Sequence, residues 1–79
     1  MKYEDFKKVS YRKLAELTGD SRSTWWNWLN LPDQSPNMIA IEKLVIGLTK
    51  EGKSVKRSQL YDFLLRRRIE AMSGDSQAA

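Results

Sequence analysis

The sequence predicts an all-α protein, a compact bundle of four to five short helices. Apolar residues recur at spacings of three and four along most of the chain, as on one face of an α-helix. No stretch alternates apolar and polar residues as a half-buried strand does, and no hairpin dipeptide occurs. Glycine and proline divide the 79 residues into segments of helix length, which suits one small domain.

The first helices are predicted from their ends. Residues 1–9 are expected to form a short helix, with Tyr3 and Phe6 three positions apart. Ser10 is expected to cap the next helix, because its hydroxyl can accept a hydrogen bond from a free amide of the first turn. Gly19 is expected to end that helix, where a positive φ is needed.

The later helices follow from the same reasoning. A third helix is expected to start after a cap at Asp20 or Ser21 and to run to about residue 30. Pro36 suits the first turn of a fourth helix, which Gly52 ends. Ser58 is expected to cap a fifth helix. The apolar stripe of the fourth helix consists of Met38, Ile41, Leu44, Val45 and Leu48. Residues 1–72 form the predicted domain and residues 73–79 a disordered tail.

Composition excludes several classes of function. Fourteen Lys and Arg against ten Asp and Glu give a net charge of +4, and the chain has no Cys and no His. Disulfides, thiol nucleophiles, Cys/His zinc sites and imidazole catalysis are therefore excluded, and we expect no enzyme, no cofactor, no metal and no small-molecule substrate. The first nine residues are too charged for a signal peptide, and no segment has the roughly 20 apolar residues of a membrane span. We expect a cytoplasmic protein without a membrane partner.

Residues 11–29, YRKLAELTGDSRSTWWNWL, carry the strongest functional pattern. Ala15 is small where two helices would cross, Gly19 suits a tight turn, and Trp25 and Trp28 recur on an inner face. This pattern resembles the helix–turn–helix of the Cro and phage-repressor type, and the resemblance extends over residues 11–48. One position departs from it: an aliphatic residue usually follows the turn glycine, whereas this chain has Asp20. We expect Asp20 to cap the helix while the two tryptophans fill the volume.

The resemblance implies which residues contact DNA bases. At about 100° per residue, Trp25, Trp28 and Leu29 share one arc of the third helix and polar residues share the opposite arc. That opposite arc would face the major groove, and the resemblance places the base contacts near the helix start and one turn on, with Ser21 at the edge of the apolar arc. The implied residues are Ser21, Arg22, Ser23, Trp26 and Asn27. Arginine can pair with guanine and asparagine with adenine, and an aromatic ring can cover a thymine methyl group or a sugar.

Phosphate contacts are expected around the same motif. Hydroxyl and ammonium groups and the free amides at helix starts bind backbone phosphates. The candidates are Tyr11, Lys13, Thr24, Asn37 and Lys43.

The last helix carries two further features. Arg66, Arg67 and Arg68 span about 200° of a helix, so we expect a solvated helix end with one or two of them touching phosphate or a partner. Tyr61, Leu65 and Ile69 are expected to face outward, beside inward Leu60, Phe63 and Leu64. These three outward residues form the predicted dimerisation surface, unless the first helix covers it.

The sequence thus predicts a sequence-specific DNA-binding transcriptional regulator, a phage- or plasmid-type repressor associated with the nucleoid. It is expected to place residues 21–30 in the major groove as a homodimer on a palindromic operator. Two alternatives stay open. Residues 23–29, STWWNWL, are also similar to excisionase and AlpA-type regulators, architectural binders of double-stranded DNA in which a two-stranded wing would be expected. The other alternative is a helical protein–protein adaptor that binds another protein through its last helix. For Trp26 itself, packing on the loop or on a second subunit is the alternative to DNA contact.

Overall fold

The computed structural model describes the backbone of residues 1–78 and the side chains of residues 1–73. Within this part of the chain the secondary structure is helical, without a strand, which confirms the all-α class. The elements are α1 (Tyr3–Phe6), α2 (Tyr11–Thr18), α3 (Arg22–Asn30), α4 (Met38–Lys50) and α5 (Arg57–Ala78). The connection between α4 and α5 contains no strand and so forms no two-stranded wing.

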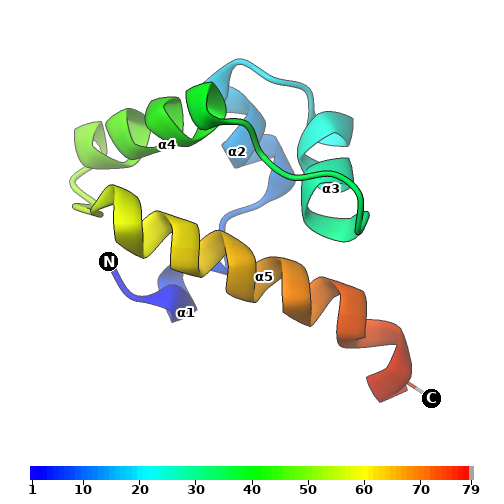
Figure 1. The fold of residues 1–79 in the computed structure, drawn as a ribbon. Coiled ribbons are helices and arrows are strands. Elements are labelled where there is room, and N and C mark those ends of the chain that lie inside the picture. The colour runs from blue at the N-terminus through cyan, green and yellow to red at the C-terminus, as the bar shows by residue number, and fades with distance from the viewer. Residues whose placement is uncertain (79) are drawn as a thin grey trace.

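The long helix α5 lies between α1 and the other three helices (Figure 1). α2, α3 and α4 lie on one side of it and α1 lies on the other, while the C-terminal end of α5 projects past α3 (Figure 1). α2 packs against both α3 and α4, and α5 packs against the same two helices. The core lies between them because each helix turns its apolar face inward. Its largest fully buried side chains are Phe6, Leu14, Trp25, Leu29, Leu44, Leu48 and Leu60.

Side-chain caps start three of the helices. The Ser10 hydroxyl accepts from the Lys13 amide at 3.0 Å, which confirms the predicted cap of α2. Ser21 caps α3 by accepting from the Thr24 amide at 3.1 Å, so of the two expected caps Ser21 is correct and Asp20 is not. Ser21 is the cap because it has the extended backbone of the position just before the first helical residue.

Two predicted helix starts are wrong by one or two residues. α4 begins at Met38 after an Asn37 cap, whose side chain accepts from the Ala40 amide at 2.8 Å, so Pro36 lies before the helix. α5 begins at Arg57, and Ser58 lies inside it. The Gln59 side chain accepts at 3.0 Å from the amide of Lys56, the residue that precedes the helix, whereas a cap at Ser58 would accept from an amide of the first turn.

The two ends of the chain also differ from expectation. α1 covers only Tyr3–Phe6, shorter than residues 1–9. α5 continues to Ala78, past the expected tail boundary at residue 73, because a single helical glycine costs only about 1 kcal/mol relative to alanine. Residue 79 lies outside the described part of the chain.

Two glycines end helices as predicted. Gly19 has φ of 79° and Gly52 has φ of 80°, in the left-handed region that L side chains avoid. The Gly19 amide donates to the Ala15 carbonyl at 2.7 Å, which closes the last turn of α2.

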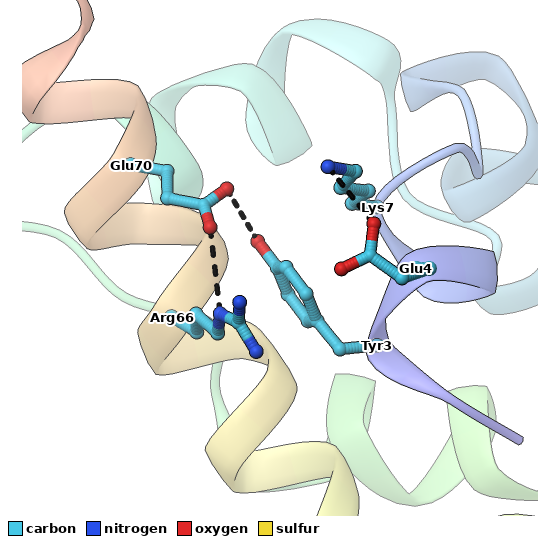
Figure 2. Close-up of polar contacts among 5 residues, drawn as sticks. All are labelled: Tyr3, Glu4, Lys7, Arg66 and Glu70. Atoms are coloured by element: carbon cyan, nitrogen blue, oxygen red, sulfur yellow. Dashed lines mark hydrogen bonds and ion pairs between the residues drawn. The ribbon is translucent and has the colours of Figure 1, made fainter.

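Arg66 joins α5 to α1 through an aromatic contact. Its guanidinium lies 4.2 Å from the centroid of the Tyr3 ring, and its Nε lies 3.4 Å from Glu70 (Figure 2). The Tyr3 hydroxyl donates to the same Glu70 carboxylate at 2.9 Å. Burial, followed by the interaction with Glu70, raises the pKa of Tyr3 to about 12. Beside this cluster Glu4 and Lys7 form an ion pair along α1 at 3.0 Å.

The other two arginines bind main-chain carbonyls, so the expected solvated helix end is wrong. Arg67 donates to the carbonyls of Phe6 at 3.2 Å and Val9 at 2.7 Å, where α1 ends. Arg68 donates to the Gln34 carbonyl at 2.6 Å in the connection between α3 and α4. The 200° spread of the triplet is what lets consecutive residues reach opposite sides of α5.

Candidate nucleic-acid interface

α3 is seated on α2 by a buried tryptophan. Trp25 is fully buried, and its indole Nε1 donates to the Thr18 hydroxyl at 2.8 Å. Thr18 in turn donates to the Leu14 carbonyl at 2.8 Å, so the buried polar atoms are satisfied. The Trp28 ring packs edge-on at 5.0 Å from the Trp25 ring and is partly buried. The inward face predicted for these two tryptophans is thereby confirmed.

The opposite face of α3 is open to solvent. Arg22 and Ser23 are exposed, and Trp26 is 47% exposed. Asn27 is partly buried on the same side. Among the side chains of residues 1–73, Arg22 is in none of the ion pairs. This helix therefore presents a guanidinium and an indole outward while its other face is fixed in the core.

Ser21 caps the start of α3, next to this open face. Its hydroxyl accepts from the Thr24 amide and lies 2.8 Å from the Thr24 hydroxyl and 3.1 Å from that of Ser23. A residue that caps the helix in this way is held in one rotamer. Of the five base-contact candidates, Ser21 is thus the one committed to the helix itself.

A surface hollow of about 440 Å³ joins the starts of α2 and α3. Two arginines, two aromatic residues and two serines line it. These residues are Ser10, Tyr11, Arg12, Arg22, Ser23 and Trp26. The sequence reasoning missed Arg12, although its place in the first turn of α2 was a usable signal. Hydroxyl groups and arginines around a concave surface are the chemistry that binds a phosphate group.

The predicted phosphate contacts are only partly brought to this hollow. Tyr11 lines it, and its hydroxyl accepts from the Asn30 side chain at 2.9 Å. Thr24 sits in the cap of α3, and Asn37 uses its side chain to cap α4.

The two lysines lie elsewhere. Lys13 forms an ion pair with Glu51 beyond the end of α4, and this contact raises the pKa of Lys13 and lowers that of Glu51. Lys43 is exposed and lines a separate hollow of about 360 Å³ between α2 and α4, beside Leu17 and Gly47. A phosphate at Lys13 would have to compete with the Glu51 carboxylate.

No family model, curated protein or solved structure matches this chain. No helix in residues 1–78 combines the length and the apolar character that crossing a bilayer requires. Within the described residues the acidic side chains form no group of three that could hold a metal ion.

Proposed function

We propose that this protein is a sequence-specific DNA-binding transcriptional regulator that inserts α3 into the major groove. The observation that carries the proposal is the division of α3 into a buried face and an open face. Trp25 and Leu29 are fully buried, whereas Arg22 is exposed at the start of the helix and takes part in none of the ion pairs among residues 1–73. The major groove admits one α-helix, and a rigidly anchored helix presents its outer residues in fixed register.

The outer residues of α3 have complementary chemistry for bases. The Arg22 guanidinium can donate two hydrogen bonds to O6 and N7 of guanine, and Asn27 can pair with N6 and N7 of adenine. Trp26 offers an apolar ring to a thymine methyl group or a sugar. It is 47% exposed, so such a contact would bury apolar surface of the ring.

The hollow beside α3 supports the positioning of the DNA backbone. Arg12 lies at the start of α2 across this hollow from the base-contact residues, so a phosphate held there would fix how α3 enters the groove. The positive ends of two helices meet at this place, which favours an anion. Arg12 therefore joins Tyr11 as the phosphate contact that the geometry favours.

The proposed regulator acts as a homodimer in the cytoplasm, bound to the nucleoid. Two copies related by a two-fold axis read a palindromic site, with one half-site for each copy. Tyr61, Leu65 and Ile69 on α5 are exposed and are the proposed dimerisation residues.

In vitro selection of bound DNA from a random pool, at low and at moderate salt, tests this proposal. A regulator of this kind enriches a palindromic sequence, and its affinity for that sequence exceeds its affinity for random DNA at both salt concentrations. Binding without enrichment would support an architectural binder instead, because phosphate contacts alone carry no sequence information. No binding at either salt concentration would leave the adaptor alternative.

A further inference from the structure

An apolar stripe runs along the free face of α5. Tyr61, Leu65, Ile69 and Met72 follow one another at spacings of four, four and three, so they share one side of the helix. Their exposed fractions are 42%, 55%, 53% and 40%. α1 does not cover them, because its Tyr3 and Phe6 rings pack on Phe63, which lies on the opposite side of α5.

A hollow of about 310 Å³ widens this stripe. It lies between α5 and the start of α4, where Pro36 and Ile41 face Tyr61 and Leu65. Asp62 and Arg68 also line the hollow, but most of its wall is apolar. The stripe and this adjacent hollow together offer a ridge and a groove to an incoming helix.

Charges on one flank of the stripe indicate what covers it. Taking Leu65 as the centre, Asp62 lies about 60° and Arg66 about 100° away in the same direction. Asp62 is exposed and in none of the ion pairs among residues 1–73. The Arg66 side chain is 60% exposed, and its Nε pairs with Glu70 at 3.4 Å while its guanidinium lies over the Tyr3 ring. A patch with an acid and a base on the same flank is complementary to itself, which is what an interface across a two-fold axis requires.

We propose that a second copy of this chain packs its α5 antiparallel on this stripe, with Leu65 next to the two-fold axis. This arrangement places Tyr61 against Ile69 of the second copy and brings Asp62 close to Arg66 of the second copy, twice by symmetry. In a parallel pair, the flank that holds both charges would meet the opposite flank, and the two charges would not meet. The inference rests on the dimeric part of the proposed function and does not depend on DNA.

Cysteine cross-linking without DNA tests the arrangement, because the natural chain has no cysteine. Single variants Tyr61→Cys, Leu65→Cys and Ile69→Cys are oxidised alone and in mixtures, and cross-linked dimers are counted on non-reducing gels. Disulfides form only between Cα atoms within about 7 Å. Leu65→Cys is expected to cross-link with itself, and Tyr61→Cys is expected to cross-link with Ile69→Cys but not with itself.

Ile46→Cys on α4 is the matched control, because its side chain is 53% exposed, close to that of Leu65. It is expected to stay monomeric on the gel. Self-cross-linking of both Tyr61→Cys and Ile69→Cys would overturn the antiparallel pairing, and cross-linking through Ile46→Cys would move the interface to α4.

Sedimentation equilibrium gives an independent reading of the same inference. Leu65→Glu is expected to raise the dimer dissociation constant at least about tenfold because it places a charge in the apolar interface, while Ile46→Glu leaves the constant unchanged. A wild-type protein that is monomeric at high concentration would overturn the inference. A dimer that fails to bind DNA would retain it and overturn only the DNA-binding proposal.

Discussion

At the scale of single residues, Tyr3 is one of the contacts that hold the four-residue helix α1 on α5. α1 is too short to be stable alone, since isolated helices below about 12 residues are marginal in water. Its Tyr3 hydroxyl donates to Glu70, and its ring lies under the Arg66 guanidinium. The contact depends on the tyrosine proton, and this makes the stability of the protein sensitive to alkaline pH.

Comparison with Tyr3→Phe measures that sensitivity. The pKa of Tyr3 is about 12 in the folded protein and about 10 when unfolded, so the unfolded chain loses this proton first as the pH rises. The stabilisation by Tyr3 is complete below pH 10 and is lost between pH 10 and pH 12. In urea unfolding, the stability advantage of wild type over Tyr3→Phe should shrink by up to about 2–3 kcal/mol across this window. An advantage that stays constant to pH 12 would contradict the account.

Arg12 is a second prediction at the residue scale. If it holds a phosphate in the hollow, Arg12→Ala weakens binding to all DNA sequences about equally and lowers the slope of log affinity against log salt by about 1. Lys2→Ala is the control, because Lys2 is an exposed cation that lies outside this hollow. Loss of affinity for one sequence only would mean that Arg12 reads bases.

At the scale of the elements, local chemistry made most of the fold predictable. The predicted cap at Ser10 and the predicted helix ends at Gly19 and Gly52 are confirmed. Caps and left-handed turns depend on a few neighbouring residues, so the sequence can predict them. The predicted starts of α4 and α5 differ from the observed ones because several neighbouring polar residues could cap each helix. The sequence alone does not show which of them does so. Ser58 has the hydroxyl of a cap, yet the helix begins before it, and the Gln59 side chain accepts from the amide of Lys56 just ahead of the helix.

The turn between α2 and α3 depends on the positive φ of Gly19. A Cβ at this position would meet no atom within 4 Å, so a substitution acts through φ alone. Gly19→Val should therefore lower the unfolding free energy by at least about 1–2 kcal/mol, and Gly19→Asn should cost less because asparagine tolerates this conformation. Thermal unfolding measures both variants. Equal melting temperatures for Val, Asn and wild type would contradict the assigned turn.

At the scale of the whole molecule, α5 organises the fold through contacts that the sequence could not reveal. A solvated helix end was the wrong prediction for Arg67 and Arg68, because their acceptors are main-chain carbonyls far away along the chain. Arg67 reaches Val9, and Arg68 reaches the connection that follows α3. The same limit applied to Arg12 in the candidate site, since the hollow forms only when the starts of α2 and α3 come together.

Removal of the Arg67 side chain tests this organising role. Arg67→Met leaves the Val9 carbonyl without its charged donor, and we expect a loss of about 2–3 kcal/mol in unfolding free energy. Arg57→Met is the matched control, because Arg57 pairs with Glu42 in an exposed position and such pairs contribute about 0–1 kcal/mol. Equal losses in urea unfolding would show that the carbonyl contacts do not stabilise the fold.

If the outer face of α3 reads DNA sequence, in vitro selection with two arginine variants reveals it. Arg22→Ala and Arg57→Ala each remove one positive charge. Arg22 is the first residue of α3, and Arg57 is the first residue of α5, whose start lies away from α3 (Figure 1). In vitro selection should return the wild-type site for Arg57→Ala. For Arg22→Ala it should return a site relaxed at one base pair in each half, with affinity reduced by about 1–3 kcal/mol. An unchanged site for Arg22→Ala, or the same relaxation for both variants, would contradict the claim.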